Sequence, residues 1–205
     1  MISFRQLWRQ CRRINEKTVL GDDTIYYKAG TDTACSTTID GVRLHFFDGS
    51  NTFREWFKNF VAFRVGLYGS AIGYDSTAKD LFDQMRGDIS STDKNVFIGF
   101  SRGGAIALLV MVRVINSMWR RGLKPNCDLL TYEAPKAGGR KLRRECRRLA
   151  FNHTRITMNG DIVPTLVPYW RGHYETTRIK LKNKEFGIRN KHTRVEKYLP
   201  DGGIC

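Results

Sequence analysis

Hydrophobic positions along this chain follow two different periods in turn. Short apolar runs bounded by Gly, Asn or Asp are typical of buried strands, whereas apolar residues every three or four positions indicate a helix with one buried face. Strands are expected at residues 24–28, 42–47, 95–99, 129–132, 155–158 and 177–181. Helices are expected at residues 3–16, 51–60, 74–85, 102–120, 140–148 and 195–199, with Gly122 ending the fourth.

Strands and helices therefore alternate along most of the chain. This order is typical of an α/β fold with a mostly parallel central sheet and helices on both faces. The length of 205 residues is enough for one full core, so residues 1–205 are expected to form a single domain. A basic helix within residues 1–20 opens that domain, and we expect it to pack on the sheet. An interfacial membrane helix is the alternative.

The most informative stretch is Gly99-Phe100-Ser101-Arg102-Gly103, between an apolar strand and the longest apolar helix. It fits G-x-S-x-G, the nucleophile elbow of α/β-hydrolases, in which a strained turn projects the serine hydroxyl upward. Glycines two residues before and after the serine avoid a clash across the turn. The alternative is an ordinary strand–turn–helix of a Rossmann-like fold with an idle serine.

A serine nucleophile needs a histidine base and an acid that orients it. In α/β-hydrolases the acid and then the base follow the serine, each on a loop after a later strand. Asp161 meets this rule because it directly follows the strand at 155–158. Two histidines come later, His173 before the last strand and His192 after it, and the order favours His192 as the base.

Several motifs in sequence order resemble the class 3 lipase family. Residues 44–50 are similar to the strand ending in F-R-G-T/S, residues 99–107 to G-H-S-L-G-G-A-L-A, and residues 130–138 to T-F-G-x-P-R-V-G. Residues 155–164 match R-V-x-N-x-x-D-x-V-P, which is the most specific of the motifs. Residues 192–198 are similar to the block that holds the family's catalytic histidine.

This resemblance implies a triad of Ser101, Asp161 and His192. It implies an oxyanion hole from the Arg102 backbone N–H and from Ser50. It also implies that residues 51–60 form a lid, whose aromatic side chains are Phe53, Trp56, Phe57 and Phe60. From their spacing alone, these aromatic residues could equally belong to a short helix packed in the core. The chain departs from the family pattern at four positions near the site, which hold Asp48, Ser70, Phe100 and Arg102.

Net charge is the main compositional signal. The chain has 35 Lys and Arg against 20 Asp and Glu, a formal charge of +15, which favours an anionic partner: nucleic acid, an acidic membrane surface or an anionic substrate. The alternative is a charged surface that only keeps the protein in solution. No RNA-binding signature or zinc finger accompanies the charge, so nucleic acid is not favoured. The five cysteines form no C-x-x-C pair, and neither a metal site nor a cofactor is expected. No signal peptide or membrane span is recognisable, so a cytoplasmic, reducing location is expected.

Two functions remain open on these grounds. The first is a serine esterase that hydrolyses carboxylic esters of lipids, triacylglycerol or phospholipid, through an acyl-enzyme. The second is a non-enzymatic basic module on a hydrolase scaffold that binds polyanions or membranes, since a fold alone does not fix activity.

Overall fold

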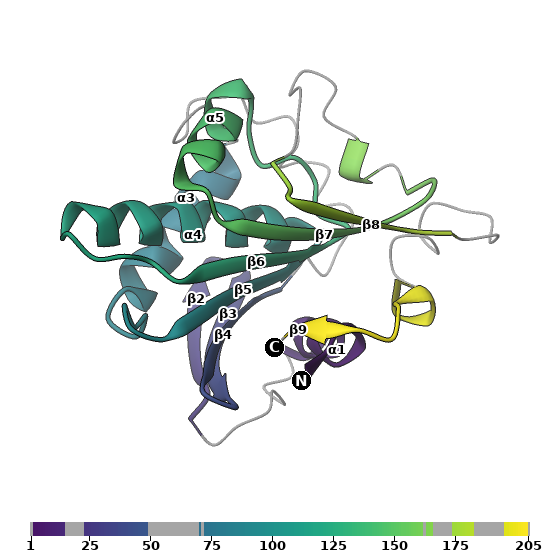
Figure 1. The fold of residues 1–205 in the computed structure, drawn as a ribbon, viewed down its shortest axis with the longest axis horizontal. Coiled ribbons are helices and arrows are strands. Elements are labelled where there is room, and N and C mark those ends of the chain that lie inside the picture. Colours follow the sequence, from purple (N-terminus) through teal and green to yellow (C-terminus); the bar gives the residue numbers. More distant parts are fainter. Residues whose placement is uncertain are drawn as a thin grey trace.

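The computed structural model describes residues 2–14, 23–48, 70, 72–161, 163–165, 174–182 and 195–204. The helix expected at residues 51–60 lies outside this part of the chain. Two short strands, β1 (Ile2–Ser3) and β9 (Gly203–Ile204), pair antiparallel and bring the two ends of the described chain together (Figure 1).

A seven-stranded sheet forms the centre, in the order β2-β3-β4-β5-β6-β7-β8. Its strands are β2 (Ile25–Ala29), β3 (Asp32–Ile39), β4 (Val42–Phe47), β5 (Lys94–Phe100), β6 (Cys127–Tyr132), β7 (Asn152–Met158) and β8 (Thr177–Leu181). Strands β4 to β8 are parallel, whereas β2, β3 and β4 pair antiparallel. The expected mostly parallel α/β sheet is confirmed, with an antiparallel edge.

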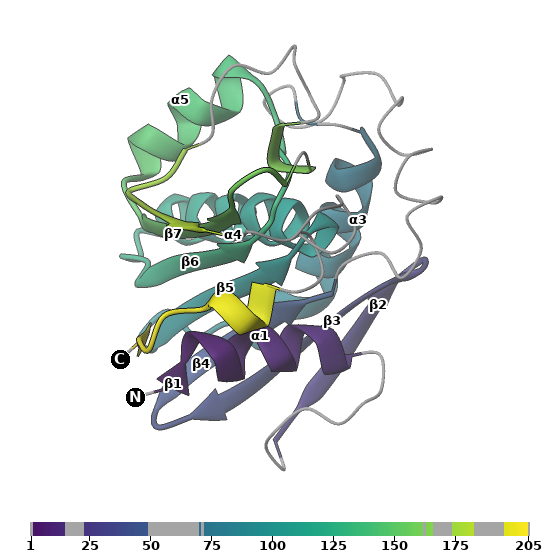
Figure 2. The same ribbon diagram turned by 90° about the vertical axis from the view of Figure 1, so that its right-hand side faces the viewer.

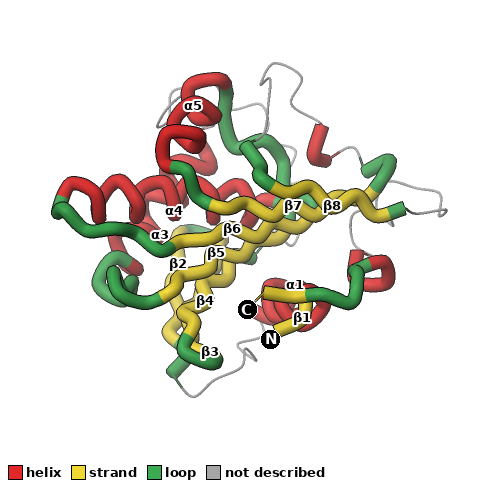
Figure 3. The backbone as a smooth tube through the Cα atoms, viewed as in Figure 1, coloured by secondary structure: helices red, strands yellow, loops and turns green. Residues whose placement is uncertain are grey.

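Helices cover both faces of the sheet (Figures 1 and 2). One face packs against α3 (Ile72–Met85), α4 (Arg102–Arg120) and α5 (Arg140–Leu149). The other packs against α1 (Phe4–Arg13) and the short 3-10 helix η4 (Val195–Tyr198). A second 3-10 helix, η3 (Val163–Thr165), follows β7. Figure 3 shows the strands β2 to β8 as one continuous layer between the two sets of helices, with β1 and β9 apart from it beside α1.

Strand β5 is the middle of the core. Its residues from Asn95 to Phe100 are all buried, because the strand has neighbours on both sides and helices on both faces. Phe97 packs toward α4, and Ile98 packs toward α1. Helix α4 is long and apolar enough to cross a membrane by composition, but 78% of its most apolar stretch is buried inside the fold, as in a core helix.

The N-terminal helix packs on the sheet as expected. Leu7, Trp8, Cys11 and Ile14 are buried in the core, so the apolar face of α1 is covered by the sheet and is not available to lie in a membrane. Ser3 caps the helix by accepting a hydrogen bond from the N–H of Gln6.

Strand β3 is the main element that the pattern did not predict. Its sequence, from Asp32 to Ile39, contains mostly small and polar residues, yet Ser36 and Thr37 are fully buried. The strand lies between β2 and β4, so its backbone is paired on both sides.

Candidate active site

Ser101 lies in a strained turn between β5 and α4. Its backbone angles are φ 51° and ψ −126°, a conformation that residues other than glycine rarely adopt. Two hydrogen bonds hold the turn: the Ser101 N–H donates to the Tyr132 carbonyl at 2.8 Å, and the Gly104 N–H donates to the Ser101 carbonyl at 3.0 Å. This is the geometry that a nucleophile elbow requires.

Three glycines around Ser101 leave room for this turn. A Cβ added to Gly99 would lie 2.5 Å from the Gly103 carbonyl oxygen, and one added to Gly103 would lie 2.3 Å from the carbonyl oxygens of Phe47 and Asp48. A Cβ on Gly104 would lie 2.6 Å from the Ala134 Cβ. The elbow is therefore packed against the ends of β4 and β6, with no space for side chains at these positions.

Ser101 sits at the N-terminus of α4 and is 6% exposed. The first N–H groups of a helix have no partner within the helix and carry partial positive charge. The elbow therefore places the Ser101 side chain beside partial positive charge, which stabilises negative charge near the hydroxyl.

The side chain of Arg102 is buried and contacts β3 and α3. Its guanidinium forms two 2.9 Å hydrogen bonds with the Asp32 carboxylate and donates to the Gly73 carbonyl at 3.2 Å. It also lies over the Tyr74 ring, 5.2 Å from the ring centroid. This arginine, where the resembled family pattern has leucine, thus joins α4, β3 and α3 in the interior, a contact that the sequence pattern does not indicate.

Asp161 lies on the loop directly after β7, as the sequence predicts. Gly160, with φ 81°, allows the turn, and the Asp161 N–H donates to the Met158 carbonyl at 3.2 Å. The Asp161 Oδ1 accepts from the Val163 N–H at 2.9 Å, and the residue is 6% exposed. One strand, β6, separates β7 from β5, so Asp161 and Ser101 follow strands that lie about 10 Å apart, and both lie beyond the carboxyl edge of the sheet.

A second carboxyl group lies beside Asp161. Glu133 follows β6, is fully buried and has a positive φ of 49°. Burial raises the pKa of Glu133 to about 10, and a hydrogen bond to the Asp161 carboxyl and its charge add to the rise. The only sequence signal for this residue is its place in the motif at residues 130–138, where the family pattern has glycine.

A basic pocket of about 390 Å³ begins at Asp161 and extends along the ends of β7 and β8. Lys136, Arg155, Arg178 and Lys180 line it. Arg155 is buried, and its ion pair with Glu175, 3.3 Å, is shared with Arg178. Burial lowers the pKa of Lys136, and the positive charge of Arg155 lowers it further. Cations outnumber anions here, so the pocket favours an anionic group.

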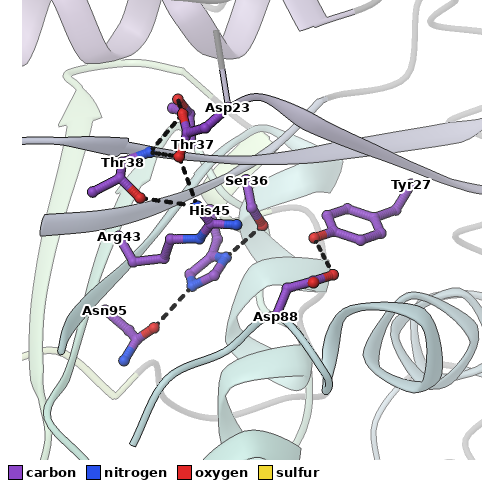
Figure 4. Close-up of polar contacts among 9 residues, drawn as sticks. All are labelled: Asp23, Tyr27, Ser36, Thr37, Thr38, Arg43, His45, Asp88 and Asn95. Atoms are coloured by element: carbon purple, nitrogen blue, oxygen red, sulfur yellow. Dashed lines mark hydrogen bonds and ion pairs between the residues drawn. The ribbon is translucent and has the colours of Figure 1, made fainter. Parts of the chain in front are cut away.

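Two histidines that precede Asp161 in the chain are packed inside the fold. His45 bonds to Ser36 Oγ at 2.7 Å and to Asn95 Oδ1 at 3.1 Å, in a polar cluster at the start of β5 (Figure 4). His153, at the start of β7, contacts Thr131 Oγ1 at 2.9 Å. Ser101 follows the opposite end of β5, so neither histidine is placed to serve as its base.

The remaining predicted site residues fall outside the described part of the chain. They are Ser50, the aromatic residues Phe53, Trp56, Phe57 and Phe60, and the two candidate bases His173 and His192. Among the described residues, no group of three or more His, Cys, Asp or Glu side chains could hold a metal ion.

Comparison with known proteins points to one family. The family model Lipase (class 3) matches residues 44–170, which include the elbow, Glu133 and Asp161. Comparison with curated protein sequences gave no match.

Solved fungal lipases have a similar fold. Lipase II from Rhizopus niveus aligns with a TM-score of 0.67 at 19% identity, over 86% of this chain and 76% of that one. A lipase from Rhizopus microsporus var. chinensis aligns with a TM-score of 0.67 at 17% identity, over 98% and 85%. Rhizomucor miehei triacylglyceride lipase aligns with a TM-score of 0.58 at 20% identity, over 78% and 67%. Two further structures of the Rhizomucor lipase, with its propeptide, are covered over only 63% and 57% of their length.

Proposed function

Because the chain belongs to the class 3 lipase family, we propose that it is a serine hydrolase that cleaves carboxylic esters of lipids. The observation that supports this most directly is the backbone of Ser101. A φ of 51° and a ψ of −126° are costly for a serine, by about 1–3 kcal/mol, and such strain is retained mainly at functional sites. An idle serine in an ordinary turn would not need this conformation.

The proposed reaction uses Ser101 as nucleophile, His192 as general base and Asp161 as the acid that orients it. The Ser101 Oγ attacks the ester carbonyl while His192 takes the hydroxyl proton. The tetrahedral oxyanion accepts hydrogen bonds from the Arg102 N–H and from Ser50, and each such donor contributes about 3–4 kcal/mol in the transition state. His192 then gives its proton to the leaving alcohol, and water hydrolyses the acyl-enzyme by the same steps.

Residues 51–60 complete the proposal as a lid. Four aromatic side chains within ten residues would cover an apolar acyl site and would expose it when the enzyme meets a lipid surface. A solved fungal lipase–inhibitor complex to which this chain is similar is described as a model for interfacial activation in lipases, which is consistent with this role.

The basic pocket favours a phospholipid, a phospholipase A-type substrate, over a neutral lipid. Lys136 and Lys180 line the pocket beside Asp161 and form no ion pair among the described residues. Together with the net charge of +15, this places positive potential at the edge of the sheet where the ester would bind. An anionic membrane surface would be attracted in the same way.

The nucleophile is tested by turnover and by covalent labelling. Wild type is expected to hydrolyse a p-nitrophenyl ester and to be labelled by a fluorophosphonate at Ser101. Ser101→Ala should lose both, whereas Ser117→Ala, a partly exposed serine on the same helix, should keep both. Label on another residue, or equal turnover by Ser101→Ala and wild type, would refute the proposal.

The charge of +15 favours one second candidate, a non-enzymatic module that binds polyanions or membranes. It predicts salt-dependent binding that Ser101→Ala does not change, with no turnover and no labelling in wild type. The strained elbow argues against it, because a binding surface has no use for a projected serine.

A further inference from the structure

Glu133 occupies a backbone position suited to glycine. It directly follows β6, where its N–H continues the sheet by donating to the Ile156 carbonyl at 2.9 Å, and its φ is 49°. The resembled family pattern has glycine here, which adopts this conformation without strain. A fully buried glutamate in this strained conformation is costly, so contacts of its side chain are expected to offset the cost.

The Glu133 carboxyl group is attached to the turn that positions Asp161. One oxygen, Oε1, accepts a hydrogen bond from the Met158 N–H. The Met158 carbonyl in turn accepts the Asp161 N–H at 3.2 Å, so a single residue joins the two acidic groups. The carboxyl of Glu133 therefore supports the last residue of β7 before the Asp161 turn begins.

The other carboxyl oxygen of Glu133 accepts no hydrogen bond from the described residues. Oε2 is buried, with less than 1 Å² exposed, and no described group donates to it. The Asp161 carboxyl lies within hydrogen-bond reach of the Glu133 carboxyl group, and it is itself an acceptor when ionised. Two buried carboxylates in contact repel each other, and one proton between them removes the repulsion and satisfies the unpaired oxygen.

The charges around the pair indicate which group holds the proton. Arg155, from β7, is the cation that faces Glu133, but its guanidinium is engaged with the Ala134 carbonyl at 3.1 Å and with Glu175. Asp161 already accepts the Val163 N–H, which stabilises its ionised form. Glu133 also accepts a backbone N–H, from Met158, which lowers its pKa, but burial outweighs this effect and raises the pKa of Glu133 to about 10, so Glu133 keeps the proton at neutral pH.

We infer that Glu133 is a positioning residue for the catalytic acid: as a neutral carboxylic acid it donates a hydrogen bond to Asp161 and fixes the orientation of that carboxylate. This inference rests on the proposed role of Asp161. A hydrogen-bonded partner behind an ionised group fixes its direction and tunes its basicity, and removing such a partner commonly costs 10- to 100-fold in activity at metal sites. A triad acid needs the same support.

Two substitutions separate positioning from a structural role. Glu133→Gln keeps an acceptor for the Met158 N–H and a donor for Asp161, so its kcat should stay within about twofold of wild type. Glu133→Gly relieves the backbone strain and removes the donor, so kcat should fall about tenfold while KM and the unfolding midpoint change little. The pH profile provides a third readout, because Glu133→Gln cannot ionise and should keep its rate above about pH 10, where wild type loses rate.

Three results would overturn the positioning role of Glu133. Full kcat and an unchanged pH profile in Glu133→Gly would show that the residue is structural only. Equal losses in Glu133→Gln and Glu133→Gly would show that donation to Asp161 is not its role. Infrared spectroscopy reads the proton without activity: wild type at neutral pH should show the carbonyl band of a neutral carboxylic acid, absent in Glu133→Gln, and its absence in wild type would overturn the inference.

Fluorophosphonate labelling separates this inference from the proposed function. Wild type that is labelled at Ser101, with an unimpaired Glu133→Gly variant, overturns the positioning role alone. Wild type that is neither labelled nor active overturns the proposed function, and with it any role in positioning a catalytic acid.

Discussion

His45 and His153 are held neutral inside the sheet. Burial lowers the pKa of His45 to about 4 and that of His153 to about 3, against an ordinary value of about 6.5 in an unfolded chain. Both rings have polar partners in their neutral form, Ser36 and Asn95 for His45 and Thr131 for His153. The folded protein therefore contains two buried imidazoles that are uncharged at neutral pH.

Acid is therefore expected to destabilise the protein through these residues. The unfolded chain binds a proton at each histidine below about pH 6.5 and the folded chain does not, so stability is complete above that pH and is lost as the pH falls toward 4. Each histidine contributes a slope of about 1.4 kcal/mol per pH unit. His45→Gln should flatten the dependence of the unfolding free energy on pH by this amount, measured by urea denaturation at several pH values. Parallel curves for variant and wild type would contradict the expectation.

Single residues of the site differ in how far the sequence could predict them. Ser101 and Asp161 follow from motifs whose spacing reflects local geometry, a turn after a strand. Glu133 does not, because its position calls for glycine by backbone conformation, and only the packing of β6 beside β7 brings its carboxyl to Asp161. The importance of such a residue arises from contacts between strands, which no local pattern records.

At the scale of elements, the ion pair of Arg102 and Asp32 joins helix α4 to strand β3. Arg102 is the first residue of α4, and Asp32 begins β3. The two side chains are only 6% and 8% exposed. The pair holds the N-terminus of α4, and so the elbow, in a fixed place relative to β3.

Breaking this pair should destabilise the protein strongly. Asp32→Ala leaves a buried guanidinium without its counterion, which commonly costs about 3–5 kcal/mol. Asp32→Ala combined with Arg102→Leu removes both charges and should recover most of that loss. Asp75→Ala removes the partner of Arg113, another arginine of α4. This variant should lose less stability, because the pair of Asp75 and Arg113 is more exposed.

Urea denaturation of the single and double variants measures the coupling between Asp32 and Arg102 directly. Additive losses in the double variant would show that the ion pair does not join these elements.

The elements themselves were predictable where the hydrophobic pattern is strong. Strands β4 and β8 have the predicted bounds, and α3 begins two residues earlier than expected. Strand β3 was not predicted, because its buried polar residues depend on hydrogen bonds to other segments. Ser36 bonds to His45, and Thr37 bonds to Asp23. Propensity describes a residue's own preference, and here tertiary hydrogen bonds override it.

At the scale of the whole molecule, the sequence establishes the size of the charge but not its position. The basic residues are spread along the chain. Their densest run lies on α5, where Glu145 neutralises part of the charge through an ion pair with Arg148. The fold brings Lys136, which follows β6, beside Lys180 on β8 in one pocket. Parallel strand order, and not sequence proximity, gathers these cations near Asp161.

The gathered charge should make hydrolysis at anionic surfaces depend on salt. On vesicles of an anionic phospholipid, the rate should fall as salt is added, because the Debye length shortens to about 8 Å at 0.15 M, whereas turnover of a neutral soluble ester should change little. Lys136→Gln with Lys180→Gln should raise the KM for these vesicles by about fivefold per lysine removed and should weaken the salt dependence. Lys28→Gln with Lys124→Gln removes the same charge from two exposed sites outside the pocket and is the matched control. If both double variants lose affinity equally, net charge alone attracts the surface, and the pocket has no special part in recognising the lipid.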